Sequence, residues 1–197
     1  MVVDRERYLD KGEVKQLRTV TEAKSIVDLR KGQVQGVLSW MLVDMALSTG
    51  LRVSELAVID IRDIDFKRCS LKVIRRKRRK KSTETMALGK DIIQHLKEYV
   101  KWTGRGKGRL FVGQRGPMTT QGLQQVWKSA IRRAGLPKEL SIHSARHTLA
   151  VHLLKKTSNL RQVQKQLGHS SPTITANMYA DITFEDMQNG VTGLYVD

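Results

Sequence analysis

Apolar residues recur along the chain at intervals that change from helical to strand-like and back. In residues 12–30 they stand among charged positions at roughly helical spacing: Val14, Leu17, Val20, Ala23, Ile26, Val27 and Leu29. This spacing predicts an amphipathic helix with one buried face. In residues 34–47 nearly every position is apolar, which predicts a helix buried in the centre of the domain. Gly50 is placed to end that helix in a left-handed cap, and residues 53–58 predict a short second helix.

The rest of the chain predicts a small sheet among further helices. Residues 70–74 and 83–88 are strand-like and flank seven basic residues, which favours a β-hairpin with a charged tip. Helical patterns return at 91–102, 120–134, 144–155 and 160–167, while 104–117 predicts a loop apart from the short apolar run 110–112. Gly168 can stop the fourth of these helices, Ser171-Pro172 predicts a helix through Tyr179, and a last helix is expected at 184–194. The predicted fold is mainly α with a small antiparallel β-sheet (α+β), in a single domain.

The charge of the chain narrows the classes of function. Its 197 residues carry 36 Lys and Arg against 19 Asp and Glu, a formal charge of +17. Such an excess is typical of proteins that bind a polyanion, with nucleic acid the leading candidate and an acidic membrane surface the alternative. No apolar run approaches the roughly 18 residues of a transmembrane span, and no signal-peptide pattern opens the chain. The single cysteine, Cys69, excludes an intrachain disulfide and a cysteine-based zinc site.

The basic run 75–81 allows two interpretations. Blocks of like charge are usually solvated or serve as localisation signals. On a hairpin tip, however, a stiff two-stranded ribbon can carry cations into a groove of a duplex. Without these seven residues the chain keeps a large positive charge, as expected for a surface that follows a phosphate backbone. The predicted DNA-binding residues are Arg75, Arg76, Arg78, Arg79, Lys80 and Lys81.

A second segment holds candidate anion ligands. His143 and Arg146 stand three apart in a predicted helix, so both side chains could share a face near the helix N-terminus. The alternative is an ordinary capped helix with polar residues that face solvent. A zinc site of His143, His147 and His152 is less favoured still, because nothing nearby supplies a carboxylate or a thiolate.

Three more candidates lie at predicted helix junctions or ends. Arg52 follows the buried helix, where a long cation is seldom unpaired, and Glu55 is its partner in a purely structural interpretation. His169 follows Gly168 at a predicted corner between helices, and Tyr179 stands near the end of the next predicted helix. Taken alone, Tyr179 is more typical of structure than of chemistry.

Together these residues form a set suited to phosphoryl transfer at a phosphodiester. Arginine side chains can bind the non-bridging oxygens and stabilise the charge that develops in the transition state. A tyrosine hydroxyl can attack phosphorus and conserve the bond energy in a phosphotyrosyl ester. Histidine can assist proton transfer, and a lysine can protonate the leaving oxygen, which an arginine hardly does at neutral pH.

Four segments resemble the catalytic domain of the tyrosine recombinases, or phage-type integrases. They are ALSTGLRVSEL at 46–56, the basic hairpin that ends in MAL at 86–88, IHSARHTLAVHLL at 142–154 and LGHSSPTITANMY at 167–179. Their order and approximate spacing match that domain from about residue 5 to the C-terminus. The resemblance implies a site-specific DNA recombinase or integrase that cleaves and rejoins strands through a 3′-phosphotyrosyl intermediate, with no metal and no cofactor.

The resemblance also implies a role for each matching residue. Arg52 and Arg146 look like the two catalytic arginines that clamp the scissile phosphate. His143 matches the first histidine position, which assists proton transfer and phosphate binding. His169 matches the second, which hydrogen-bonds the phosphate, and Tyr179 looks like the nucleophile.

The catalytic lysine is less sharply assigned. In relatives it lies just after the first hairpin strand, which puts Arg76 and Lys77 nearest in register. The hairpin is a few residues longer than in some relatives, so Lys80 or Lys81 is an alternative. Lys77 is the favoured residue.

The resemblance carries further expectations about organisation and partners. Residues 1–197 are expected to form the catalytic domain, with the N-terminal DNA-binding domain of relatives absent. The tail 180–197 carries an apolar stripe and is expected to form a helix that docks on its own domain or on a neighbouring protomer. The expected partners are double-stranded DNA and further copies of the chain, as a tetramer on paired sites, with no membrane. A cytoplasmic location is expected, with nucleoid association in a prokaryote.

Two other functions fit the same residues. One is a DNA-relaxing activity like that of a type IB topoisomerase, which uses the same chemistry. The other is a non-catalytic DNA-binding module that keeps the fold, whose mark would be a missing active-site residue.

Overall fold

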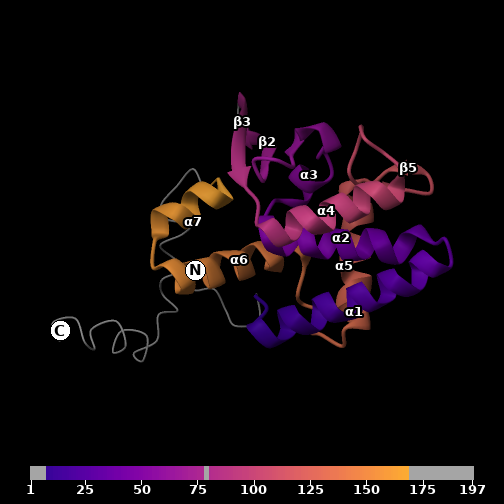
Figure 1. Cartoon of the computed structure of the whole chain (residues 1–197). Helices are drawn as coiled ribbons and strands as arrows, with labels where there is room; N and C mark the ends of the chain where they lie inside the picture. Colours follow the sequence, from indigo (N-terminus) through magenta and orange to yellow (C-terminus); the bar gives the residue numbers. More distant parts are fainter. Residues whose placement is uncertain (1–7, 78–79, 169–197) are drawn as a thin grey trace.

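The computed structural model describes residues 8–77 and 80–168. In these ranges the helices are α1 (Lys11–Arg30), α2 (Val34–Thr49), α3 (Val53–Leu56), the 3-10 turn η2 (Ile61–Asp63), α4 (Lys90–Thr103), α5 (Thr120–Arg133), α6 (Ile142–Thr157) and α7 (Leu160–Leu167). The strands are β1 (Ile64–Asp65), β2 (Ser70–Lys77), β3 (Lys80–Ala87), β4 (Val112–Gly113) and β5 (Gly116–Pro117). Figure 1 shows the predicted fold class confirmed, mainly α with little antiparallel sheet.

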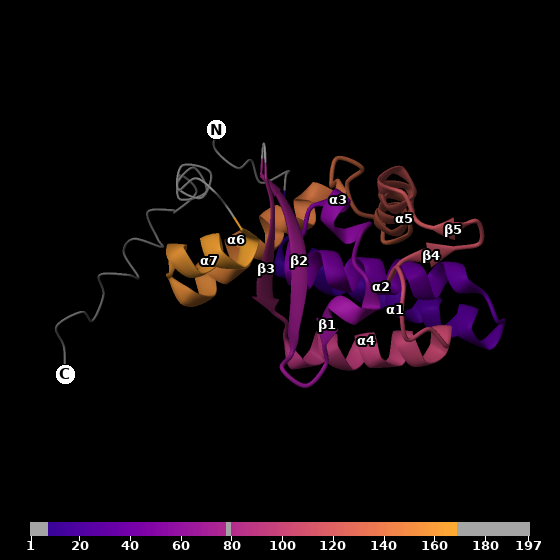
Figure 2. The ribbon, with the colours of Figure 1, turned by 90° about the horizontal axis from the view of Figure 1, so that it is seen from above.

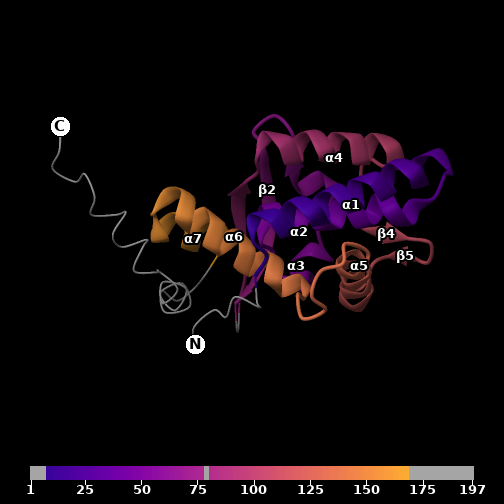
Figure 3. The same cartoon turned by 90° about the horizontal axis from the view of Figure 1, so that it is seen from below.

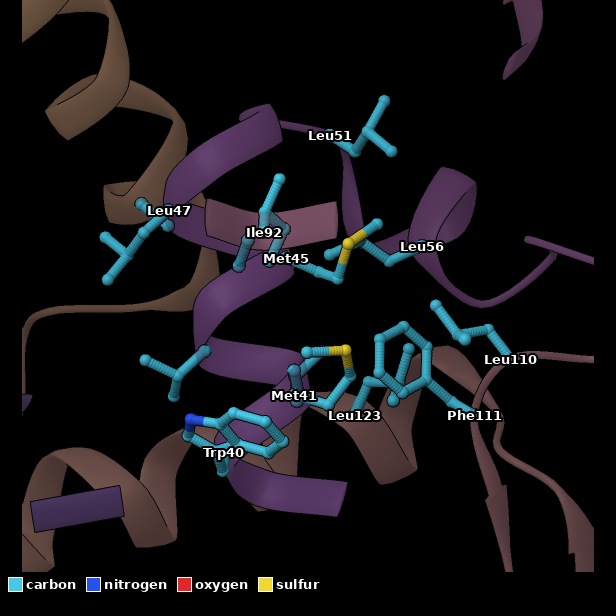
Figure 4. Packing of buried hydrophobic residues seen from close by; sticks show 14 of the residues in the cluster. Trp40, Met41, Met45, Leu47, Leu51, Leu56, Ile92, Leu110, Phe111 and Leu123 are labelled. Atoms are coloured by element: carbon cyan, nitrogen blue, oxygen red, sulfur yellow. The ribbon is translucent and has the colours of Figure 1, made fainter. Parts of the chain in front are cut away.

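Helix α2 lies at the centre of the fold, as its apolar sequence predicts. Helices α1, α4, α5 and α6 pack against it, and Figure 3 shows α1 and α4 alongside it. Met41 and Met45 are fully buried and lie beside Phe111 and Leu56 (Figure 4). Burial of such side chains contributes about 1.5–3 kcal/mol each to folding. Gly50, at φ +60°, ends α2 and donates its N–H to a carbonyl of the last turn, so the predicted left-handed cap is confirmed.

A buried ion cluster joins three helices near the middle of α2. The side chain of Asp44 is 1% exposed, and its Oδ1 accepts a hydrogen bond of 2.8 Å from Arg18 Nε on α1. Its Oδ2 lies 2.5 Å from Nδ1 of His95 on α4. Because α2 runs directly into the turn at Gly50, this cluster also fixes the helix that positions the segment after it.

We expect Asp44→Ala to lower the free energy of unfolding by about 1.5–3 kcal/mol, because it removes the hydrogen bonds that a buried carboxylate makes with Arg18 and His95. Arg18→Ala is the matched variant, since it removes a partly exposed cation and leaves His95 beside Asp44. Its expected cost is about 1 kcal/mol. Urea unfolding of both variants measures the difference, and equal losses would contradict this account of the cluster.

Strands β2 and β3 form a longer hairpin than the sequence predicts. Their pairing runs from Ser70 opposite Ala87 to Lys77 opposite Lys80, so much of the basic run belongs to the strands. The ladder continues through charged positions because backbone groups form it. The predicted limits of 70–74 and 83–88 are therefore wrong in extent, and residues 78–79 lie outside the described part.

Smaller differences concern the ends of elements. Helix α3 ends at Leu56, two residues before its predicted end, and α6 begins at Ile142, two residues before its predicted start. The apolar run at 110–112 leads into β4, which pairs with β5 in a second two-stranded sheet. None of these differences changes the predicted order of helices and hairpin.

Helices α6 and α7 stand beside the hairpin at one end of the described structure (Figures 1 and 2). They share a small apolar cluster, which consists of Ala150, Val151, Val163 and Leu167. Gln166 Nε2 on α7 donates to the carbonyl oxygen of Ala87 at 3.1 Å, which ties α7 to β3. Gly168, at φ +65°, ends α7 as the sequence predicts. The chain therefore reaches residue 169 from a point next to the hairpin.

Three predicted features lie outside the described residues. They are His169 at its helix corner, the helix that ends near Tyr179, and the tail helix at 184–194. Across 8–77 and 80–168, every helix falls short of the length or the apolar character that a membrane span needs.

Candidate active site

Arg52 is held at the junction of α2 and α3. Gly50 turns the chain out of α2, and Arg52 then takes the N-cap position of α3. Its backbone N–H donates to Glu55 Oε2 at 2.8 Å, and its Nη1 donates to Glu55 Oε1 at 3.1 Å. The side chain of Arg52 is nevertheless 44% exposed, whereas that of Glu55 is 4% exposed. The buried carboxylate of Glu55 thus orients Arg52, while the guanidinium of Arg52 stays open to solvent.

Arg146 lies on α6 and is buried in the same region. Its Nη1 donates to the carbonyl oxygen of Gly50 at 2.7 Å, and its Nη2 donates to that of Leu167 at 2.9 Å. Both carbonyls stand at helix C-termini, where carbonyl groups lack partners within the helix and favour a cation. One guanidinium therefore joins the end of α2, the first turns of α6 and the end of α7.

Arg75 does not lie on a solvated hairpin tip, which is where the sequence prediction puts it. Its side chain is 3% exposed, because successive residues of a strand point to opposite faces and Arg75 shares the buried face with Leu71 and Val73. Its Nη1 donates to Glu55 Oε2 at 2.9 Å, and its Nη2 donates to the carbonyl oxygen of Gln166 at 3.3 Å. The predicted place of Arg75 on a solvated tip is therefore wrong, because its side chain lies buried within β2.

The guanidinium groups of Arg52 and Arg75 thus pair with the carboxylate of Glu55, and Arg146 lies close enough for its pKa to respond to the charges of all three residues. Burial, and after it the charge of Arg52, lowers the pKa of Arg146 to about 10, while the charge of Glu55 opposes that shift. Arg146 therefore remains charged at neutral pH. Within this cluster the positive charge exceeds what Glu55 balances. Such an arrangement favours an anion with several oxygen atoms, as a phosphodiester has.

The structure describes the other predicted site residues only in part. His143 lies in the first turn of α6, three residues before Arg146, and its side chain is exposed. Lys77 ends β2, where its backbone pairs with Lys80. The side chains of residues 76–81 lie outside the described part, as do His169 and Tyr179 altogether. The structure thus brings Arg52 and Arg146 into one cluster, and the roles of the histidines, the lysine and the tyrosine stay predictions.

The inward place of Arg75 and its pairing with Glu55 differ from what the sequence predicts, which is a charged tip and a Glu55 paired with Arg52 alone. The period of two that Leu71 and Val73 set places Arg75 on the same face of the strand, although the apolar Ile74 interrupts the alternation. Extending that alternation through residue 77 would have put Arg75 on the buried face of a single strand. Among the residues that the structure describes, no three His, Cys, Asp or Glu side chains gather as a metal site would require.

Sequence comparison supports this picture. The chain matches the model of the phage integrase family over residues 7–186. It is 35% identical over 156 residues to the tyrosine recombinase XerD of Corynebacterium glutamicum, which covers 75% of this chain and 49% of that protein. It is 34% identical over 174 residues to the tyrosine recombinase XerC of Treponema denticola, which covers 78% of this chain and 56% of that protein. The chain spans about half the length of these curated relatives.

Solved structures share the fold. The crystal structure of XerA recombinase aligns with a TM-score of 0.74 and 22% identity, over 93% of this chain and 61% of that one. The Tn1549 transposon integrase in complex with transposon right end DNA aligns with a TM-score of 0.74 and 21% identity, over 98% of this chain and 67% of that one. At these identities the likeness concerns the fold, whereas the family match covers nearly the whole sequence. The chain therefore belongs to the phage integrase family, the tyrosine recombinases.

Proposed function

We propose that this chain cleaves and rejoins double-stranded DNA at a specific site through a 3′-phosphotyrosyl intermediate. The observation that carries the proposal is that Arg52, which pairs with Glu55, and Arg146 lie close enough for the charges of Arg52 and Glu55 to shift the pKa of Arg146, in a protein of this family. The excess of 36 basic over 19 acidic residues agrees with a polyanionic partner. The chain would act as the catalytic domain, in the cytoplasm.

In the proposed reaction Tyr179 supplies the nucleophile. Its phenol oxygen attacks the scissile phosphorus, the bond from phosphorus to the 5′ oxygen breaks, and a 3′-phosphotyrosyl ester forms. The phenol proton passes to His143, and Lys77 gives a proton to the leaving 5′ oxygen. Attack by a 5′-hydroxyl of a partner strand reverses these steps. Because one phosphodiester replaces another, the exchange is close to isoenergetic.

The arginines stabilise the charge that builds up on the non-bridging oxygens. Arg52 is partly exposed and so can reach a phosphate from the surface. Arg146 adds a positive charge that solvent screens little, because its side chain is buried. Carbonyl oxygens of Gly50 and Leu167 hold the Arg146 guanidinium before any DNA is bound. Preorganised donors of this kind need no rearrangement in the transition state.

Strand exchange between two sites requires more than one protomer. Related structures include the XerH site-specific recombinase bound to its difH substrate and a lambda integrase dimer bound to a core site. By analogy we propose that this chain pairs DNA sites as a tetramer, and that residues 180–197 contribute to contacts between protomers. His169 would hydrogen-bond the phosphate that Tyr179 attacks.

Covalent trapping tests the proposal. The substrate is a pool of duplexes with a randomised centre and a nick, which lets the cleaved fragment diffuse away. We expect covalent protein–DNA adducts that survive denaturation with detergent. Sequencing the trapped DNA defines a selected duplex for later kinetics. Absence of any adduct would contradict the proposal, and relaxation of a supercoiled plasmid without exchange between two selected sites would indicate topoisomerase activity instead.

A further inference from the structure

Arg75 connects three elements that meet at the candidate site. Its backbone belongs to β2, its Nη1 donates to Glu55 on α3, and its Nη2 donates to the carbonyl oxygen of Gln166 at the end of α7. Its Nε lies 3.4 Å from Glu84 Oε2 on the neighbouring strand β3. The side chain of Arg75 is 3% exposed and that of Glu55 is 4% exposed, so this pair is shielded from solvent, whereas Glu84 is 33% exposed.

We propose that Arg75 is a positioning residue that holds Arg52 and the end of α7 in the geometry needed for strand cleavage. This inference rests on the proposed function. Arg75 acts through its neighbours and does not itself touch the DNA.

The route to Arg52 runs through the two oxygens of Glu55. Oε1 accepts from Arg52 Nη1, while Oε2 accepts from both the Arg52 backbone and Arg75 Nη1. Without Arg75, the Glu55 carboxylate loses its buried cation and can rotate or draw in water. Arg52, which is half exposed and held mainly by that carboxylate, then loses its fixed orientation. Misplacement of a reacting group by about 1 Å can cost about 100-fold in rate.

The second route runs to the end of α7. Arg75 binds the carbonyl of Gln166, and Arg146 binds that of the next residue, Leu167. The guanidinium of Arg75 also lies against Gly168, where an added Cβ would come within 2.6 Å of Arg75 Nε and 2.8 Å of its Cζ. Two arginines thus fix the point from which the chain continues toward His169 and Tyr179.

Stability alone does not explain why an arginine stands at position 75. Leu71 and Val73 precede Arg75 on the buried face of β2, so an apolar side chain there would continue an ordinary core strand. Replacing a buried ion pair by apolar residues is often neutral or stabilising. A buried arginine that reaches two neighbouring helices instead fixes their relative arrangement.

The first experiment compares Arg75→Met and Arg75→Lys with the unchanged chain on the selected nicked duplex. At saturating DNA we expect Arg75→Met to slow single-turnover adduct formation by about 10- to 100-fold. DNA affinity should change by less than about threefold, because the charge of Arg75 is already paired with Glu55. Arg75→Lys keeps the charge but not the forked geometry, and should recover part of the rate.

A double-mutant cycle tests the route through Glu55. If Arg75 acts through that carboxylate, Arg75→Met should slow cleavage much less in a Glu55→Gln background than in the unchanged chain. A purely structural role would move the melting temperature but leave the rate of the folded protein at saturating DNA unchanged. Additive effects of the two substitutions on that rate would overturn the proposed route.

A glycine pair tests the contact with Gly168. Gly168→Ala strains the left-handed backbone and also pushes on the Arg75 guanidinium. Gly104→Ala is the matched control, because Gly104 caps α4 at φ +64° with nothing within 4 Å of an added Cβ. We expect Gly168→Ala to lose more stability than Gly104→Ala because of the added contact, and only Gly168→Ala to slow cleavage by the folded protein. Equal rates for the two variants would contradict the contact.

The outcomes separate this inference from the proposed function. If the unchanged chain forms no adduct, the proposed function fails. If it forms the adduct and folded Arg75→Met cleaves within about twofold of it, the positioning role is overturned. Should Arg75→Met fail to fold, the rate of Arg75→Lys decides, and a rate equal to that of the unchanged chain would overturn the proposal.

Discussion

Replacing Arg146 by alanine is expected to slow adduct formation on the selected duplex by about 100- to 1,000-fold, the usual effect of removing a donor that stabilises transition-state charge. The side chain of Arg146 is buried, and burial together with Arg52 already depresses its pKa, so an added phosphate relieves unbalanced positive charge. The measurement is the single-turnover rate at saturating DNA. Arg146→Lys keeps a positive charge but loses the paired contacts to Gly50 and Leu167, and should give an intermediate rate.

The control for this variant removes one charge elsewhere. Arg30 is exposed in the last turn of α1. Figure 1 shows that α1 ends on the side of the fold away from α6 and α7. Arg30→Ala should cleave within about twofold of the unchanged chain. Melting temperatures must accompany the rates, because Arg146 also joins three helices. A folded Arg146→Ala variant that cleaves as fast as Arg30→Ala would contradict the assignment of the phosphate clamp.

Replacing Tyr179 by phenylalanine is expected to abolish the adduct and leave DNA binding nearly unchanged. Phenylalanine keeps the ring but lacks the oxygen that attacks phosphorus, whereas the basic surface that binds the phosphates is untouched. The measurement pairs the detergent-resistant adduct with the dissociation constant for the same duplex. Retention of normal adduct formation would show that another group is the nucleophile.

Tyr99 provides the matched tyrosine control. It is fully buried in α4, its hydroxyl donates to the carbonyl oxygen of Leu110 at 3.3 Å, and burial raises its pKa to about 12. It therefore stays protonated and out of reach of DNA. Tyr99→Phe should lose roughly 1 kcal/mol of stability with its hydrogen bond and form the adduct at the normal rate.

Much of the fold follows from local pattern. The helical spacing of residues 12–30 and the continuous apolar run from 34 to 47 give α1 and the central α2, and Gly50 and Gly168 end their helices as expected. The hairpin was predicted too short, because the basic run looks like a loop by composition alone. Cross-strand backbone pairing carries β2 to Lys77 despite the charge of those positions.

At the candidate site, local sequence patterns predict which residues matter but not the contacts that orient them. The motifs that carry Arg52 and Arg146 pointed to a shared role, but not to the carbonyls of Gly50 and Leu167 that orient Arg146. Those contacts join positions far apart in sequence, and no local spacing encodes them. The same holds for Arg75, whose partners lie on α3 and α7 and whose burial opposes the usual behaviour of a charge run.

Locating the covalent bond between protein and DNA tests directly whether Tyr179 is the nucleophile. The trapped complex is digested with nuclease and protease, and the peptide that keeps a phosphonucleotide is sequenced by mass spectrometry. We expect the added mass on Tyr179, and we expect Arg146→Ala to lower the yield of this peptide at short times. A phosphonucleotide on any other residue, or none on a protein that binds the selected duplex, would contradict the account.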